Sequence, residues 1–330
     1  MKKGFTLIEL LAVIVILAII ALIATPIVLN IINETKESAT LRSAEFYMDA
    51  VENKIAMEML KWETLDGPYN ITKDGDLCKE TLTAEKTCPD NKAIKIEVSG
   101  EKPKSGNVII SNGNIDGASL ELGNKTLGIN GNGGVVPVCV LSSDSNKKGT
   151  ELGAKYICEV RPGEKQIFYV LSTEEDGSTN LIMDSNICNN GALASSSNTC
   201  LVAWNDSGSS ANGPVTAMTY LNNATSAWTN LENLNILYND EGGHFEDFRI
   251  TGKARMPYYN EINNMSSNEN DYLYVNLGGP DSIVGYWSLS TWTSNSSFAH
   301  VVSLNGSNSV VSVDAPETRP GVRPVINVKL

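Results

Sequence analysis

The first twenty residues, MKKGFTLIELLAVIVILAII (1–20), open an apolar run that carries a single carboxylate, Glu9. Apart from Glu9, Thr6 and Thr25, all residues from Phe5 to Leu29 are apolar or small. These 25 residues would form a helix about 37 Å long, which is enough to cross a membrane. An unpaired charge in hydrocarbon costs at least roughly 2.5–3.5 kcal/mol, so the presence of Glu9 needs a reason.

Two common explanations of such a run meet difficulties at particular residues. A cleaved secretory signal needs a short apolar core followed by small residues at the cleavage site. Here the run is longer, and Leu22 lies where a small residue is required. An uncleaved membrane anchor fits the length and remains an alternative, but it explains neither Glu9 nor the short polar leader, residues 1–4.

Residues 2–26, KKGFTLIELLAVIVILAIIALIATP, resemble the class III leader and N-terminal helix of type IV pilins and pseudopilins. The shared features are a basic leader ending in Gly4, then Phe5, a glutamate at Glu9 and a proline at Pro26. The resemblance implies cleavage between Gly4 and Phe5 by a prepilin peptidase and N-methylation of Phe5. It also implies a bacterial protein that lies in the cell membrane before assembly and in a surface filament afterwards.

The same resemblance gives Glu9 and Pro26 roles in assembly. Glu9 lies four residues from the new amino terminus at Phe5, on the same helical face. In the family, this carboxylate pairs with the terminal amine of a neighbouring subunit, which sets the register between subunits. Pro26 is expected to bend or locally melt the helix. The implied partners are other pilin subunits, the prepilin peptidase and the membrane.

The helix is expected to continue to Trp62, giving a pilin helix over 5–62 whose first part, 5–29, is transmembrane. The sequence LDGPY (65–69) then ends it. Beyond Pro26, apolar residues recur at steps of three and four among charged ones, which predicts a stripe facing a globular head. The expected stripe consists of Ala44, Met48, Val51, Ile55, Met59 and Trp62.

A small antiparallel sheet is predicted over 63–137. The segments 93–100, 106–115 and 118–129 alternate apolar and polar residues and are separated by Asn-Gly or Gly-Asn turns. A sheet packed on the second half of a long helix is also what the pilin resemblance predicts. The stretch INGNGGVVP (129–137) is expected to be a glycine-rich linker, with an irregular hairpin as the alternative. The predicted fold class is therefore α+β.

The remaining residues, 138–330, are expected to form a second, mixed α+β domain. Their order of elements resembles the bacterial C-type-lectin-like fold, shared with formylglycine-generating-enzyme-like domains. In that comparison Arg255 and Arg323 are expected to anchor loops, with Glu261 as one acceptor. The matching features are a helix bearing Trp228, a turn with Arg255, Met256, Pro257 and Glu261, a strand with Tyr286 and Trp287, and a last strand from Gly321 to Ile326.

The six cysteines fall into three sequence-local pairs. Export across the membrane places them in an oxidising compartment, where disulfides are favoured. Many connectivities are open, and we expect the nearest-neighbour set, in which each bond closes a short loop. The expected disulfides are Cys78–Cys88, Cys139–Cys158 and Cys188–Cys200.

Charge and motifs exclude several functions. The net charge is −13, which argues against direct binding of nucleic acid. The sequence has no Ser-His-Asp ordering, nucleotide-binding loop or H-E-x-x-H motif, so we expect neither an enzyme nor a cofactor. The acidic stretch around His244 is expected to be a solvated loop, with Ca²⁺ binding through its carboxylates as the alternative. No metal site is assigned.

We expect a structural subunit of a type IV pilus-like filament, a minor or tip pilin that displays a lectin-like adhesion domain. Its ligand contacts are expected at Tyr286, Trp287 and Trp292, because exposed aromatic residues are favoured in recognition surfaces. A host, cell-surface or glycan ligand fits this role. The alternatives are a pseudopilin of a secretion or DNA-uptake machine that binds no ligand, and a membrane-tethered enzyme.

Overall fold

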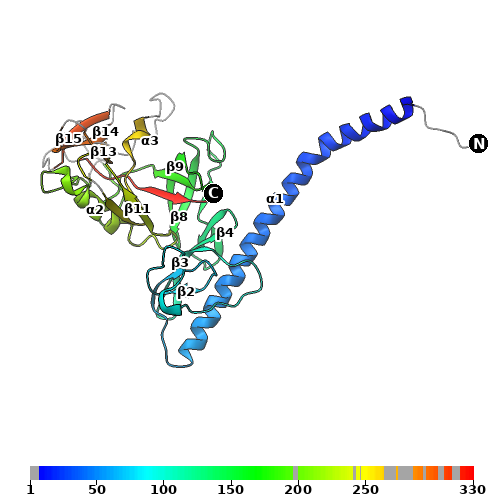
Figure 1. Ribbon diagram of the computed structural model, residues 1–330, viewed down its shortest axis with the longest axis horizontal. Helices are drawn as coiled ribbons and strands as arrows, with labels where there is room; N and C mark the ends of the chain where they lie inside the picture. The colour runs from blue at the N-terminus through cyan, green and yellow to red at the C-terminus, as the bar shows by residue number, and fades with distance from the viewer. Residues whose placement is uncertain are drawn as a thin grey trace, which may run out of the picture.

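The computed structural model describes residues 7–195, 200–240, 243–245, 247–263, 273, 285–292, 295–303, 308–313 and 320–330. Its longest described element is α1, a helix from Leu7 to Met59. Figure 1 shows the first half of α1 projecting away from the rest of the chain and its second half lying against strands. We call residues 63–137 the head and residues 138–330 the C-terminal region.

The second half of α1 packs on the head through one face. Its buried residues occur at helical spacing, so a single stripe meets the sheet. The helix ends at Met59, and Trp62 has a left-handed backbone, φ 65°, and a 96% exposed side chain. The expectation that Met59 and Trp62 extend the stripe is therefore wrong, because Met59, the last residue of α1, is 50% exposed and Trp62 lies beyond the end of the helix. The buried stripe is Ala44, Tyr47, Met48, Val51 and Ile55.

The head is a six-stranded sheet in the order β2-β1-β3-β4-β5-β6, and every pairing in it is antiparallel. The predicted hairpins at Asn112-Gly113 and Gly123-Asn124 form between β3 and β4 and between β4 and β5. Asn112 and Gly113 both have positive φ, as a two-residue hairpin turn requires. The strands are β1 (Gly67–Ile71), β2 (Leu77–Cys78), β3 (Ser105–Ser111), β4 (Asn114–Leu122), β5 (Lys125–Ile129) and β6 (Val135–Pro137).

Two segments of the head differ from the prediction. Residues 93–100 form no strand, since only Ile94 makes a bridge, to Leu77. Alternation alone does not make a strand where no neighbour is available. The expected linker 129–137 is instead an irregular hairpin, because Val135–Pro137 pairs with β5 as the edge strand β6.

The C-terminal region is built around a five-stranded sheet in the order β16-β10-β9-β8-β7. The last strand of the chain, β16, returns to pair antiparallel with β10. A two-stranded sheet, β11-β12, and a three-stranded sheet, β13-β14-β15, complete it. The strands of the large sheet are β7 (Cys139–Leu141), β8 (Lys155–Arg161), β9 (Glu164–Thr173), β10 (Thr179–Met183) and β16 (Val325–Val328).

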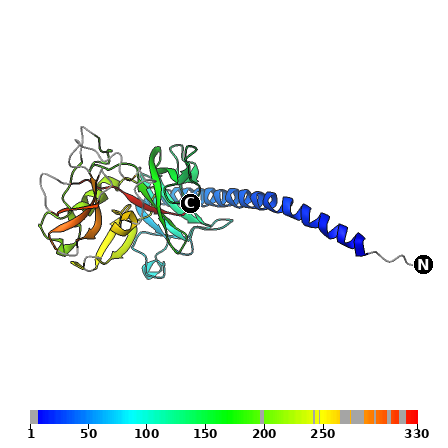
Figure 2. The same ribbon diagram turned by 90° about the horizontal axis from the view of Figure 1, so that it is seen from above.

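Short helices and the two smaller sheets lie between β10 and β16 in sequence. Figure 2 shows this C-terminal region on the side of the head opposite to the projecting helix. The elements between β10 and β16 are the 3₁₀ turn η2 (Ser210–Asn212), helices α2 (Val215–Thr225) and α3 (Tyr259–Asn263), and strands β11 (Leu234–Tyr238), β12 (Phe248–Gly252), β13 (Gly285–Thr291), β14 (Phe298–Ser303) and β15 (Asn308–Ser312). The head has a 3₁₀ turn of its own, η1 (Pro89–Asn91).

The head and the C-terminal region have separate hydrophobic cores. The core of the head joins the α1 stripe to inward-facing residues of the sheet, such as Val108, Leu120 and Leu127. The largest core of the C-terminal region is rich in aromatic residues and includes Trp204 and Trp287. Helix and antiparallel sheets together make the chain α+β, as predicted, while the lectin-like fold stays a prediction.

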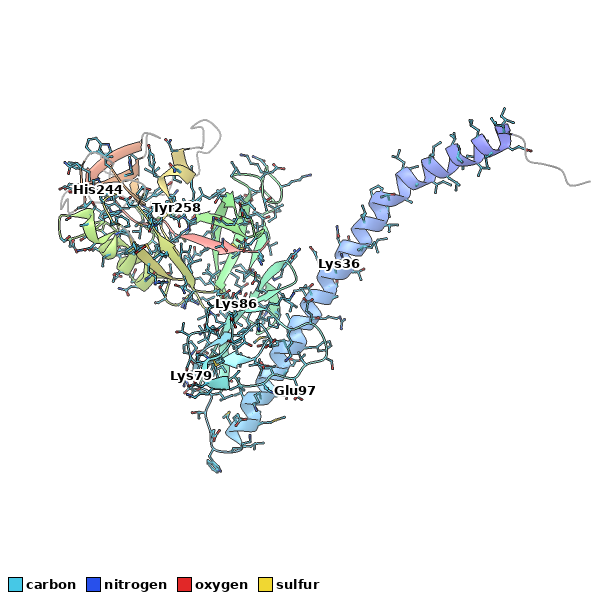
Figure 3. The ribbon with its side chains drawn as sticks, viewed as in Figure 1. Lys36, Lys79, Lys86, Glu97, His244 and Tyr258 are labelled. Carbon is cyan, nitrogen blue, oxygen red and sulfur yellow. A yellow bond between two sulfur atoms is a disulfide. The ribbon has the colours of Figure 1, made fainter. Side chains whose placement is uncertain are left out.

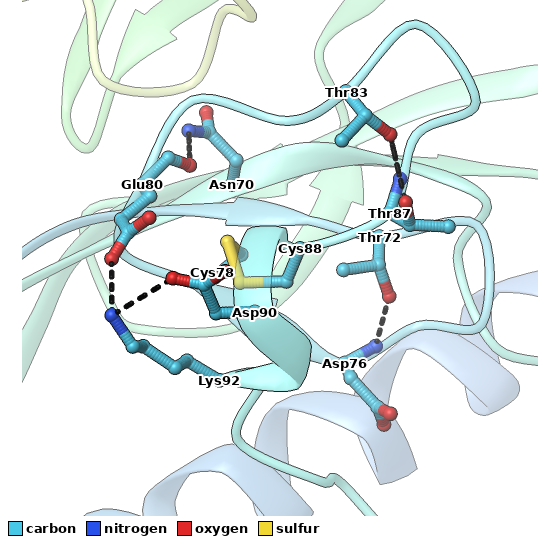
Figure 4. The surroundings of a disulfide bond; sticks show 10 residues. All are labelled: Asn70, Thr72, Asp76, Cys78, Glu80, Thr83, Thr87, Cys88, Asp90 and Lys92. Atoms are coloured by element: carbon cyan, nitrogen blue, oxygen red, sulfur yellow. Dashed lines mark hydrogen bonds and ion pairs between the residues drawn. A yellow bond between two sulfur atoms is a disulfide. The ribbon is translucent and has the colours of Figure 1, made fainter.

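The three disulfides of the structure are the three expected pairs, Cys78–Cys88, Cys139–Cys158 and Cys188–Cys200. Figure 4 shows the first of them, which ties β2 to the residue before η1. Beside it, Lys92 forms ion pairs with Glu80 and Asp90 at 3.5 and 3.4 Å. The disulfide therefore fixes a segment that contributes only two residues to the sheet.

Candidate assembly helix and recognition surface

The first half of α1 exposes its apolar side chains on every face. Leu7 is 83% exposed, Ile14 55% and Ile32 43%. Within the described part of the chain, α1 is the one helix that is long and apolar enough to cross a membrane. Water is a poor solvent for such a surface. This half of α1 is therefore suited to lipid, or to the same helix of other subunits.

Glu9 lies in the first turn of α1 and is exposed. Its position near a helix N-terminus is favourable for a negative charge, because the macrodipole is positive there. Gly4 and Phe5, the predicted processing site, lie outside the described residues. The structure thus places the carboxylate of the predicted assembly pair.

Pro26 lies inside α1, and the helix continues through it. Proline has no N–H to donate to the carbonyl of Leu22, so the helix loses one internal hydrogen bond there. Next to it, the hydroxyl of Thr25 donates to the carbonyl of Ala21 at 2.6 Å, a contact typical of bent helices. Figure 1 shows α1 curved along its first half. Of the two expected effects, bending is observed and melting is not.

Two of the three predicted ligand-contact residues are in the core. Tyr286 and Trp287 are both 0% exposed. The indole N–H of Trp287 donates to the carbonyl of Val202 at 2.8 Å. The guanidinium of Arg323 lies 4.7 Å from the centre of the Tyr286 ring. These contacts correct the prediction for Tyr286 and Trp287, because a side chain without exposed surface cannot touch a ligand in solvent.

Trp292, the third predicted contact, lies at the surface with 37% of its area exposed. Its ring packs edge-on against Phe298 at a centroid distance of 5.9 Å. Its carbonyl lies 2.7 Å from Nε2 of His244, which Figure 3 labels. Since a carbonyl can only accept, Nε2 of His244 is the donor in this hydrogen bond. Trp292 is therefore an exposed aromatic side chain on a backbone fixed by a neighbouring loop.

Asp240 anchors that loop. Its carboxylate accepts hydrogen bonds from the N–H of His244 at 3.0 Å and from the N–H and hydroxyl of Thr291. These donors occupy a carboxylate of the acidic stretch for which Ca²⁺ binding was the alternative. Among the described residues, no group of three or more His, Cys, Asp or Glu side chains is arranged to hold a metal ion. Glu241 and Glu246, from the same acidic stretch, lie outside the described residues.

Buried arginines anchor loops in the C-terminal region, as expected. Arg255 is 2% exposed and forms a two-pronged ion pair with Glu261 at 2.8 and 2.6 Å. Burial alone would lower the pKa of Arg255, but Glu261 opposes it and the net shift is upward. Arg323 is completely buried and donates to the carbonyls of Leu273 and Asp184 at 3.0 and 2.9 Å.

The head and the C-terminal region meet at a hydrogen-bonded seam, which we define as residues 126–129 against Asn230 and Lys329. The side-chain nitrogen of Asn230, Nδ2, donates to the carbonyls of Ile129 and Glu159 at 2.8 and 3.0 Å. Its side-chain oxygen, Oδ1, accepts from the backbone N–H of Ile129 at 3.2 Å. A Cβ on Gly128 would lie 2.8 Å from the carboxamide carbon of Asn230. The absence of a side chain at Gly128 therefore permits this contact.

The last strand reaches the same seam. The N–H of Lys329 donates to the hydroxyl of Thr126 at 2.8 Å, and Thr126 donates back to the carbonyl of Lys329 at 2.9 Å. The ammonium of Lys329 also pairs with Glu121. Sequence reasoning missed all of these residues, since a loop asparagine and a C-terminal lysine have no periodicity. The seam holds the C-terminal region against the head through several independent contacts.

The comparison with known families gives one match. Residues 1–25 match the model described as the prokaryotic N-terminal methylation motif. No curated protein and no solved structure matches the chain. The motif includes the first 19 residues of α1, Leu7 to Thr25, in its exposed half. Motif and helix together support a type IV pilin-like or pseudopilin-like protein, which implies processing by prepilin peptidase and assembly with other pilins.

Proposed function

We propose that the chain is a minor or tip subunit of a type IV pilus-like filament and displays its C-terminal region for recognition. The observation that carries the proposal is α1: most of its first half lies within the methylation motif and its apolar surface is uncovered, while its second half anchors a folded head. A filament built from such helices buries the uncovered surface between subunits. The head then lies on the outside of the filament.

The C-terminal region supports the minor or tip position. It occupies the side of the head opposite to α1 (Figure 2), and the seam holds it there through the side chains of Asn230 and Lys329. A domain of this size carried by every subunit would crowd a filament shaft. At a tip, or in occasional subunits, it projects freely. The lectin-like fold is part of this proposal.

Recognition is assigned to the surface around Trp292. This side chain is exposed, packs on Phe298 and has a backbone fixed by His244. Rigid aromatic side chains bury much area for little loss of conformational entropy. The ligand class in this proposal is a cell-surface or glycan ligand, and the protein acts as a binding subunit without catalysis or a cofactor.

The first test concerns assembly. Peptide mapping of the purified protein is expected to recover an N-methylated Phe5 as the first residue, and intact Met1 would contradict processing. Glu9→Gln is expected to remain in the membrane fraction and to be lost from sheared filaments. Glu52→Gln is the matched control, because Glu52 is exposed on the same helix and is not part of the proposed pairing.

The second test concerns recognition. Trp292→Ala is expected to reduce adhesion of filamented cells at least about tenfold, as for loss of a hot-spot side chain, while filaments assemble normally. Trp62→Ala is the control, since Trp62 is the more exposed tryptophan and lies at the end of α1, away from the proposed site. Unchanged adhesion in Trp292→Ala would remove the site assignment. Absence of the protein from extracellular filaments, with normal processing, would favour the pseudopilin alternative.

A further inference from the structure

The backbone carbonyl of Leu231 accepts hydrogen bonds from two side-chain nitrogen atoms that come from distant parts of the chain. Nδ2 of Asn107, on β3 of the head, donates to it at 3.3 Å. Nζ of Lys253, which follows β12 in the C-terminal region, donates to the same oxygen. Two hydrogen bonds of ordinary length to one oxygen keep their donors within about 6 Å of each other. A lysine amine and a side-chain carboxamide are therefore neighbours across the contact between the two regions.

Both side chains are withdrawn from water. Asn107 is 6% exposed and Lys253 9% exposed. Burial lowers the pKa of Lys253 to about 8, because the ammonium is poorly solvated there. A neutral amine has a free electron pair and is a nucleophile. In the described part of the chain, Oδ1 of Asn107 accepts no hydrogen bond, so the carboxamide is not engaged in a structural network through that atom.

A carboxyl group lies beside the pair. Glu232 follows Leu231, interacts electrostatically with Lys253 and accepts a hydrogen bond from the N–H of Gly106, the residue before Asn107. The surrounding protein raises the pKa of Glu232 by desolvation, although the residue retains exposed surface. Glu232 also lines a polar cavity of about 180 Å³ together with Lys86, which Figure 3 labels between the two regions.

We propose that Lys253 and Asn107 form an intramolecular isopeptide bond that joins the C-terminal region covalently to the head. Nζ of Lys253 attacks Cγ of Asn107, the new C–N bond forms, and the bond from Cγ to Nδ2 breaks. Nδ2 leaves as ammonia with one proton from Nζ, so atoms and charge balance without another reactant. Glu232 acts as the proton carrier, protonating the carboxamide as the amine attacks and taking up the proton of Nζ.

The bond would change how a pulling force passes through the molecule. Force that enters through α1 would reach Asn107 and pass directly to Lys253. The seam and residues 108–252 would then lie outside the loaded path. The inference does not depend on the ligand of the C-terminal region or on the position of the subunit in a filament.

The test is tryptic peptide mapping of the full-length, detergent-solubilised protein after reduction. Cleavage after Lys104, Lys125, Arg249 and Arg255 is expected to give one branched species in which 105–125 is joined to 250–255, with no cleavage after Lys253. The branched species should be about 17 Da lighter than its two parts, the mass of ammonia. Recovery of 105–125 and 250–253 as separate peptides from the folded wild-type protein would overturn the proposal.

Variants identify the reacting atoms. Asn107→Asp is expected to form the same bond with loss of water, about 18 Da in place of about 17 Da. Lys253→Arg is expected to remove the branched species, and the control Lys165→Arg, at an exposed lysine, to retain it. Glu232→Gln is expected to reduce the joined fraction at least about tenfold after equal time, because the proton carrier is lost. A joined species in Lys253→Arg would also contradict the assignment.

Discussion

Both halves of α1 present apolar side chains, the first on every face and the second in one stripe among charged residues, but the two halves differ in what covers those side chains. In the first half, residues such as Val15 have nearly half their surface exposed, whereas Val51 in the second half has none. The difference does not come from the helix, which is continuous from Leu7 to Met59. It comes from the head sheet, which covers one half. An apolar helix face thus becomes either a core or an assembly surface according to whether its own chain supplies the cover.

The largest test of this comparison exchanges one residue type in the two halves. Val51→Asp places a charge in the core of the head and is expected to destabilise it by about 4 kcal/mol or more. Val15→Asp is expected to leave the stability of the head within about 0.5 kcal/mol but to impair membrane insertion, by roughly 2.5–3.5 kcal/mol. Thermal unfolding in detergent and membrane extraction measure the two effects. Equal unfolding temperatures for the two variants would break the comparison.

A second test asks whether the C-terminal region depends on the cover that the head supplies. Asn230→Ala removes three hydrogen bonds and leaves buried backbone groups of Ile129 and Glu159 without them. The expected loss is about 3 kcal/mol, and hydrogen exchange should rise at Ile129. Asn223→Ala, at an exposed asparagine of α2, is the control. Equal hydrogen exchange at Ile129 in the two variants would show that the contacts of Asn230 do not stabilise the head.

The smallest expected effect concerns Tyr47, inside the covered half of α1. Its ring is 0% exposed, and its hydroxyl has no hydrogen-bond partner among the described residues. Burial accordingly raises the pKa of Tyr47 far above its ordinary value. Tyr47→Phe removes an uncompensated polar group and is expected to stabilise the head by about 1 kcal/mol, raising its unfolding temperature by several degrees. A lower unfolding temperature would mean that the hydroxyl contributes a favourable contact.

Local patterns predicted the parts of the fold that depend on local physics. The apolar run predicted α1, and the Asn-Gly and Gly-Asn pairs predicted two hairpins, because their turn conformations favour those residues. Helical spacing extended the α1 stripe too far, to Trp62, since periodicity does not show where a chain turns away. Alternation at 93–100 also failed, because a strand requires a partner that the sequence does not reveal.

The candidate site was predictable to a smaller extent. Glu9 was recognisable from the sequence because a carboxylate in an apolar run is costly, and Trp292 was correctly placed at the surface. Tyr286 and Trp287 were not separable from it, since aromatic residues serve cores and surfaces alike. Asn230 and Lys253 carried no signal at all: their importance comes from partners in distant segments, which only the folded chain brings together.

The return of β16 to β10 has a consequence for the order in which the chain is made and exported. The head sheet pairs strands that are close in sequence, and such local contacts form quickly. The large sheet of the C-terminal region cannot be completed until residues 184–324 have followed β10 and β16 has emerged. The head is therefore expected to fold first, while the C-terminal region is still crossing the membrane. Lys329 would then be among the last residues to dock, and it would bind Thr126 on a head that has already folded.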